Sequence, residues 1–128
     1  MKIDHVALYC VDLEAMRNFF VQHLNAVCNH EYHNPRTGLR AYFLQFQDGG
    51  CQLEIMSRPE VAEAHNGLFD SGFIHICISV GSREQVDALT NSIHAAGFEI
   101  QSGPRITGDG YYESCILGPE GVLVELTV

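Results

Sequence analysis

Four side chains of metal-ligand type recur at matching places along this chain. His5 lies in the segment IDHVALYCV and His75 in FIHICISV, while Glu54 lies in CQLEIM and Glu125 in VLVELTV. Neutral imidazoles and carboxylates suit divalent ions such as Ni, Co, Zn, Mn and Fe. Because two carboxylates balance the charge of such an ion, the four residues predict one divalent metal ion in a formally neutral ligand set.

The two His–Glu pairs belong to an internal repeat. Sliding the chain over itself by about 70 residues aligns both pairs at once, with Gly50 and Gly121 at the same distance before the Glu residues. A Pro-Arg pair followed by Gly and Tyr also recurs in the middle of each half. The pattern predicts repeat one over residues 1–56, a connection over 57–71 and repeat two over 72–128, each folding as βαβββ within one domain.

A helix is predicted after the opening strand of each repeat. Asp12 suits the N-cap of the first helix, and Ser82 with Gln85 forms a capping box for the second, which Gly97 ends. Apolar residues at helical spacing predict the buried stripes: Leu13, Met16, Phe20 and Leu24 in the first helix, and Val86, Leu89, Ile93 and Ala96 in the second.

Strand alternation turns all four candidate ligands to one face of the predicted sheets. Their neighbours of opposite parity, such as Val6, Leu53, Ile76 and Val124, are aliphatic and suit packing against a helix. A single His or Glu in a strand is usually a packing or solvent-facing residue, and that alternative remains open for each. Carboxylates gathered on one partly desolvated face repel each other unless a cation joins them, which favours a metal.

Composition excludes several classes of function. The 128 residues carry a net charge of −9 with scattered basic residues, which disfavours nucleic acids and anionic membranes as partners. No apolar run is long enough to span a bilayer, and the first residues lack a secretory pattern. The five cysteines form no CxxC pair, as in a reducing compartment. We therefore expect a cytoplasmic protein with a small-molecule substrate.

From His5 to Val128 the chain resembles the vicinal oxygen chelate superfamily (glyoxalase, bleomycin resistance, dioxygenase), because His, Glu, His and Glu stand in order on the first and last strands of the two repeats. The quartet is closest to short bacterial glyoxalase I, lactoylglutathione lyase. The resemblance implies an α+β fold in which tandem βαβββ repeats form a U-shaped mixed β-sheet half-barrel with helices on its outer face. It also implies a homodimer whose sites are shared between protomers.

By the same resemblance the protein is a metal-dependent lyase of glyoxalase I type. Such an enzyme isomerises a hemithioacetal through a metal-stabilised enediolate, and Glu125 is the candidate base with Glu54 in a matching role. Three alternatives stay open: a thiol transferase, a CoA-thioester epimerase, and a non-catalytic module that sequesters a drug or metabolite.

The substrate-binding residues differ from the usual ones. Short bacterial glyoxalase I carries Arg where this chain has Tyr9 and Asn where it has Arg58, so glutathione is not implied. An acidic part of a different substrate could meet one of four arginines: Arg36, Arg40, Arg58 or Arg105. Further candidates for the pocket wall are Cys77, Tyr111 and Tyr112, for which ordinary packing is the alternative.

Overall fold

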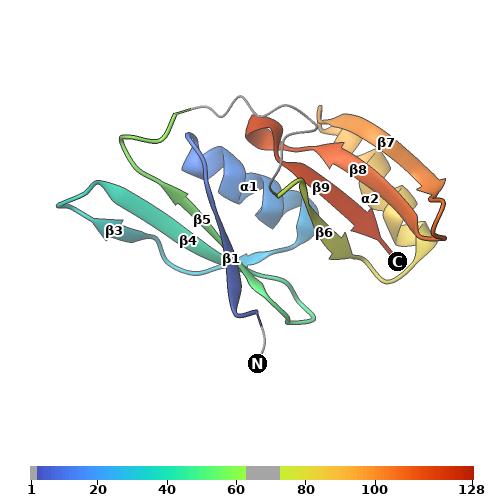
Figure 1. Cartoon of the computed structure of the whole chain (residues 1–128), viewed down its shortest axis with the longest axis horizontal. Coiled ribbons are helices and arrows are strands. Elements are labelled where there is room, and N and C mark those ends of the chain that lie inside the picture. The colour runs from blue at the N-terminus through green and yellow to red at the C-terminus, as the bar shows by residue number, and fades with distance from the viewer. Residues whose placement is uncertain (1–2, 63–72) are drawn as a thin grey trace. The chain divides into compact units, whose positions relative to one another are not determined.

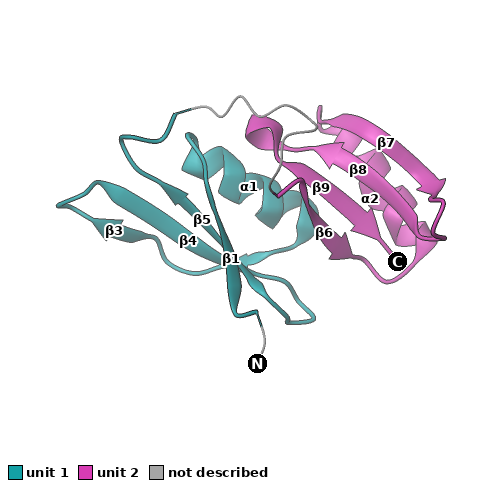
Figure 2. Ribbon diagram, in the orientation of Figure 1, with its two compact units in different colours: residues 1–65 teal, residues 66–128 magenta. Residues whose placement is uncertain are grey.

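Each half of the chain folds as a strand, a helix and a further set of strands. The computed structural model describes residues 3–62 and 73–128, and it divides into two compact units, residues 1–65 and 66–128 (Figure 2). The first unit contains β1 (His5–Tyr9), α1 (Leu13–Leu24), β2 (Val27–Cys28), β3 (Tyr32–Asn34), β4 (Leu39–Gln45) and β5 (Gln52–Ser57). The second contains β6 (His75–Ser79), α2 (Arg83–Ala95), β7 (Glu99–Ile106), β8 (Tyr112–Leu117), the 3₁₀ turn η1 (Pro119–Gly121) and β9 (Leu123–Thr127).

The two sheets share one topology (Figure 1). Their orders are β1-β5-β4-β2, with β3 also pairing β4, and β6-β9-β8-β7. In each unit the opening strand lies parallel to the last strand, and the last strand lies antiparallel to its other neighbour. The α+β class and the tandem βαβββ order are thus confirmed. Where one strand was expected after α1, the chain forms the two short segments β2 and β3.

Helix α1 begins where its sequence predicts. The Asp12 side chain accepts a hydrogen bond from the Ala15 N–H at 2.9 Å, and this satisfies one of the free donors of the first turn. Its buried stripe consists of Leu13, Met16, Phe19, Phe20 and Leu24. The helix ends at Asn25, whose positive φ of 53° is a conformation that Asn tolerates better than most residues.

Helix α2 departs from its prediction on the buried face. Ser82 accepts a hydrogen bond from the Gln85 N–H at 3.2 Å, so the N-cap half of the predicted box forms. The predicted burial of Ala96 is wrong, because Ala96 is the exposed C-cap, one residue past the last turn. Thr90, a polar residue, is buried instead, and its hydroxyl donates to the Val86 carbonyl and meets the Ser114 hydroxyl of β8 at 2.6 Å.

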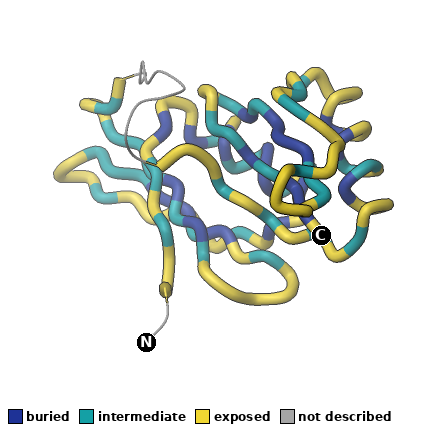
Figure 3. Tube along the Cα trace, turned by 45° about the vertical axis from the view of Figure 1, so that its right-hand side comes forward, coloured by how far each residue is buried: buried dark blue, intermediate teal, exposed yellow. Residues whose placement is uncertain are grey.

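The helix in each unit packs on one sheet face only. Helix α1 contacts β4 and β5, and α2 contacts β7, β8 and β9. On these faces the residues of the inner strands are buried, among them Leu53, Ile55, Ile116 and Val124, whereas Glu54 and Glu125 lie at alternate positions and keep some exposure. Figure 3 shows buried, intermediate and exposed stretches following one another along the trace. The predicted aliphatic face and ligand-bearing face therefore exist in both units.

The predicted repeat boundaries remain predictions. The connection expected over residues 57–71 is described only as far as residue 62, and residues 63–71 together with residue 72 lie outside the described residues. Neither α1 nor α2, the helices of the described chain, is long and apolar enough to cross a membrane.

Candidate metal centre

His5 and Glu54 face each other across β1 and β5. The two strands are parallel, with His5 opposite Gln52 and Ala7 opposite Glu54, so the two candidate ligands lie on neighbouring rungs of one face. The His5 Nε2 atom lies 3.8 Å from Glu54 Oε2. The Glu54 side chain is 18% exposed and the His5 side chain 43% exposed, which leaves both reachable by an ion from solvent.

The His5 ring is held by two neighbours. Its Nδ1 atom lies 3.1 Å from Asp4 Oδ2, and the His5 and Phe43 rings form a T-shaped pair at a centroid distance of 5.5 Å. When Nδ1–H donates to Asp4, the neutral imidazole presents the lone pair of Nε2 on the side of Glu54. Carboxylates in this role commonly orient metal-binding histidines. Asp4 was missed by sequence reasoning, although a carboxylate next to a candidate ligand was a usable signal.

The second unit repeats the pair with a shorter distance. The His75 Nε2 atom lies 3.2 Å from Glu125 Oε2, and the Glu125 side chain is again 18% exposed. Glu125 stands between two cysteines, because Cys77 of β6 and Cys115 of β8 are its direct partners in the ladder. The second ligand pair therefore has a thiol on each side.

Both thiols are poor nucleophiles at neutral pH. Burial first, and then the negative charges of Glu125 and Glu113, raise the pKa of Cys115 to about 11. The same causes in the same order raise the pKa of Cys77. Since the thiolate is the reactive form, these shifts disfavour a reactive thiol at Cys77, whereas its exposed position does not support the packing interpretation. They also place a second carboxylate, Glu113, near the pair.

The donor atoms in each pair fit a divalent cation. Within residues 3–62 and 73–128, neither Glu54 nor Glu125 forms an ion pair with Lys or Arg, so histidine is the only basic partner of each carboxylate in that part of the chain. No group of three or more His, Cys, Asp and Glu side chains is arranged to hold a metal ion among the described residues. Each unit thus supplies two donors, whereas metal sites in proteins use three or more.

Tyr9 and Arg58 lie at the far end of the first sheet from His5. Tyr9 is exposed at the end of β1, on the same face as His5. The Arg58 guanidinium binds Glu60 through two bonds of 2.7 and 3.0 Å. This contact, with a smaller contribution from the Tyr9 hydroxyl, raises the pKa of Arg58. Its charge is therefore already balanced within the chain.

Tyr111 and Tyr112 point to different surroundings. Tyr111 is exposed in the β7–β8 turn, where its backbone bonds to Thr107. The Tyr112 hydroxyl donates to Asp87 of α2 at 2.6 Å, and the Arg83 guanidinium lies 4.9 Å from its ring centroid. Tyr112 thus lies on the helix-packed face and not on the face of Glu125. This agrees with ordinary packing, the alternative to a role in the pocket wall.

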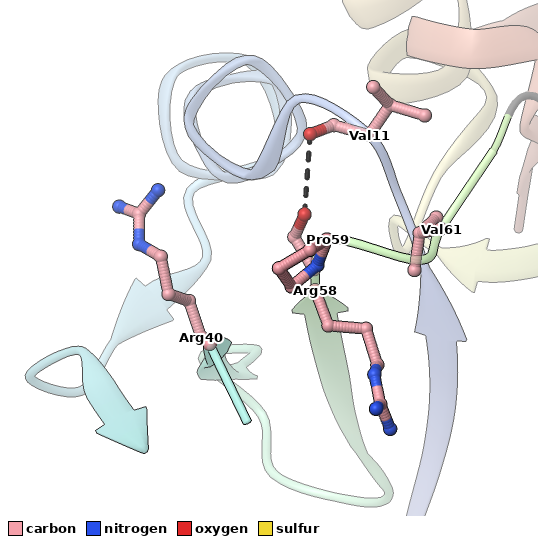
Figure 4. A pocket seen from close by; sticks show the side chains of 7 residues that line it. Val11, Arg40, Arg58, Pro59 and Val61 are labelled. Carbon is pink, nitrogen blue, oxygen red and sulfur yellow. Dashed lines mark hydrogen bonds between the residues drawn. The ribbon is translucent and has the colours of Figure 1, made fainter. Parts of the chain in front are cut away.

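A cavity of about 320 Å³ in the first unit contains neither candidate ligand (Figure 4). Arg40 and Arg58 line it and point in different directions. The hydroxyl of Ser57, another lining residue, donates to the Val11 carbonyl at 3.3 Å. The remaining lining residues are Gly38, Pro59 and Val61. Each of the two guanidinium groups binds one Glu carboxylate through two bonds, so neither leaves that forked pair of N–H groups open to an acidic ligand in the cavity.

Arg40 belongs to a polar network that ties α1 to β4. Its guanidinium binds Glu31 and Glu14, and the Tyr42 hydroxyl donates to Glu14 at 2.9 Å. Burial, together with this bond, raises the pKa of Tyr42 to about 12, so the hydroxyl stays protonated. Arg36 is the third candidate arginine of the first unit, beside Arg40 and Arg58, and it is exposed. The network is structural and holds the helix on the sheet.

Comparison with known proteins gives a consistent result. The family model described as Glyoxalase/Bleomycin resistance protein/Dioxygenase superfamily matches residues 2–126. The uncharacterized protein YqjT of Bacillus subtilis is 30% identical over 132 residues, which cover 97% of this chain and 96% of YqjT.

Two solved structures illustrate the shared fold. The trypanothione-dependent glyoxalase I of Leishmania major has a TM-score of 0.80 at 19% identity, covering 99% of this chain and 86% of the enzyme. The fosfomycin resistance protein FosX of Listeria monocytogenes, complexed with Mn(II) and sulfate, has a TM-score of 0.75 at 19% identity, covering 98% and 90% of the two chains.

Proposed function

Because the chain belongs to the Glyoxalase/Bleomycin resistance protein/Dioxygenase superfamily, we propose that it is a divalent-metal-dependent lyase of glyoxalase I type that isomerises a small hemithioacetal. The observation that carries the proposal is the repeated His–Glu pair, with imidazole and carboxylate facing each other on the helix-free face of each unit.

His5, Glu54, His75 and Glu125 are the residues proposed to hold the metal. One ion requires both pairs, which come either from one chain or from the two protomers of a homodimer. A bound Ni, Co, Zn, Mn or Fe ion supplies Lewis-acid polarisation of a substrate carbonyl oxygen. The reaction takes place in the cytoplasm in this proposal.

Glu125 is the proposed base. It removes the proton from the carbon beside the carbonyl and returns it to the neighbouring carbon, and Glu54 is the matching group of the other repeat. Two features of the second unit support this role. The Glu125 carboxylate has no Lys or Arg partner within the described chain, and burial raises the pKa of the two thiols beside it, Cys77 and Cys115.

Turnover by the metal-loaded protein tests the proposal. The wild type with Ni, Co or Zn isomerises hemithioacetals formed from methylglyoxal and small thiols, measured as thioester formation. Glu125→Gln loses turnover by about 10²-fold or more, the size expected when a general base is removed, and keeps much of the metal. Glu99→Gln, an exposed carboxylate of the same unit, is the matched control and keeps full activity.

The alternatives give different results in the same experiment. Full activity of Glu125→Gln removes Glu125 from the role of base. A metal-loaded wild type that adds a thiol to an epoxide or epimerises a CoA thioester, with no isomerisation of any hemithioacetal, identifies one of the other enzymes. Light scattering combined with size-exclusion chromatography tests the homodimer.

A further inference from the structure

The second unit carries a charged pair on the same sheet face as Glu125. Strand β8 alternates, and the hydroxyls of Tyr112 and Ser114 bond to α2, so Glu113 and Cys115 point away from the helix. Cys115 is the direct ladder partner of Glu125. Glu113 therefore lies on the ligand-bearing face, one rung further along β8.

Glu113 is nearly buried and binds Arg105. Its side chain is 12% exposed, and the Arg105 guanidinium, 57% exposed, lies 3.5 Å from its Oε1 atom. The two residues are direct partners across β7 and β8. Glu113 is opposite Thr127 in the ladder with β9, which makes it a diagonal neighbour of Glu125. Diagonal neighbours on one face are about 7–8 Å apart, within reach of long side chains.

The first repeat has no such pair. Phe43 is the ladder partner of Glu54, just as Cys115 is the ladder partner of Glu125. Two residues before Phe43, at the position that corresponds to Glu113, the first repeat has Ala41. The sheet face beside the first ligand pair is thus apolar where the second is charged. Two repeats that supply the same ligands differ in what they offer to a bound molecule.

On the basis of the proposed function, we propose that Arg105 binds a carboxylate on the thiol-derived part of the substrate and that Glu113 positions the Arg105 guanidinium for this contact. A guanidinium has five N–H donors, and the single long contact to Glu113 leaves a forked pair for a carboxylate. The nearly buried Glu113 carboxylate holds the Arg105 guanidinium in place, and the exposed side of that guanidinium contacts the ligand. Arg83, the other arginine of the sequence from 66 to 128, which contains no lysine, stacks on Tyr112 beside α2 and faces away from the site.

The pair favours an anion over a cation for a geometric reason. An ammonium ligand of Glu113 would have to displace or pass the more exposed Arg105, whose charge repels it. A carboxylate binds the exposed side of Arg105 without breaking the ion pair. The carboxylate recognised here belongs to the same molecule whose carbonyl lies at the metal.

The test compares binding of an acid and its neutral amide. N-acetyl-S-methyl-L-cysteine and N-acetyl-S-methyl-L-cysteinamide differ only in the charged group, and S-methylcysteamine supplies an ammonium. Affinities are measured by NMR titration of the full-length protein, with and without Zn. The wild type is expected to bind the acid about tenfold more tightly than the amide, the size of one charge-assisted hydrogen bond. Arg105→Ala removes this preference, and the matched control Arg83→Ala keeps it.

Glu113→Gln tests the positioning role. It is expected to weaken binding of the acid about threefold to fivefold and to leave the amide unchanged, whereas general damage to the fold weakens both. The proposal is overturned if Arg105→Ala still binds the acid more tightly than the amide. It is also overturned if the wild type binds S-methylcysteamine more tightly than the acid and Glu113→Gln abolishes that preference. Binding is measured with and without Zn, so the absence of an acid preference is seen separately from a failure to bind metal. Only a failure to bind metal counts against the proposed function.

Discussion

The buried hydroxyl pair between Thr90 and Ser114 gives a quantitative test of how α2 lies on its sheet. The Thr90 hydroxyl donates its one hydrogen to the Val86 carbonyl. In the contact between the two hydroxyls, Ser114 is therefore the donor and Thr90 the acceptor. Thr90 is 3% exposed and Ser114 0% exposed. Thr90→Val keeps the shape of the side chain but leaves the Ser114 hydroxyl without this partner, which costs about 1–3 kcal/mol.

Removing the other hydroxyl has a smaller effect. In Ser114→Ala the Thr90 hydroxyl still donates to Val86, so the loss is about 1 kcal/mol, a lost acceptor contact and a small void. In the double variant neither hydroxyl is left buried alone, and the free energy of unfolding returns to within about 1 kcal/mol of the wild type.

Urea unfolding of the four proteins measures the coupling. We expect Thr90→Val to be the least stable and the two changes to be non-additive by about 1–3 kcal/mol. Additive effects would refute the contact, and with it the strand parity that turns Glu113 and Cys115 away from the helix.

Other predictions concern single positions. Gly103→Ala should destabilise the fold by more than about 2 kcal/mol, because Gly103 has a φ of +82° and a Cβ there would lie 2.5 Å from a backbone oxygen of β8; Gly108→Ala, where a Cβ meets nothing within 4 Å, should change urea unfolding little. Tyr42→Phe should cost about 1 kcal/mol at pH 7. Because the folded pKa of Tyr42 is raised to about 12, its contribution is complete below pH 10 and lost as pH rises toward 12, so Tyr42→Phe should flatten unfolding free energies over that range. The Arg40 contact lowers the pKa of Glu31 below 4.5. The stability that this contact contributes is present above pH 4.5 and lost as pH falls below it. The unfolding free energy of Glu31→Gln should therefore depend less on pH in acid than that of the wild type. A Tyr42→Phe curve that parallels the wild type above pH 10, or a Glu31→Gln curve that parallels it below pH 4.5, would contradict these assignments.

The sequence predicted what the repeat and strand alternation determine. The pairing of His5 with Glu54 on one face follows from alternation along two apolar strands, and the duplicate pair in the second half makes the same case independently. The N-caps Asp12 and Ser82 form because a local side chain satisfies a local donor, which a sequence displays directly.

Contacts set by register between distant elements were not predictable in the same way. Thr90 is buried only because Ser114 of β8 lies against it, and neither residue alone indicates this. Nothing in the sequence near Glu113 indicates its ion pair, since the partner Arg105 comes from the neighbouring strand. Tyr112 is placed by Asp87, 25 residues earlier in the chain.

Metal stoichiometry tests the central claim most directly. Elemental analysis of the protein dialysed against one equivalent of Zn or Ni should give one tightly bound ion per chain, whether a site lies within a chain or between two. His5→Ala and His75→Ala, one from each unit, should each weaken binding at least tenfold, and the exposed His30→Ala should not. Loss of metal in both variants is the result the account predicts. A wild type that binds no divalent ion, or variants that both retain it fully, would contradict a metal held by the two His–Glu pairs.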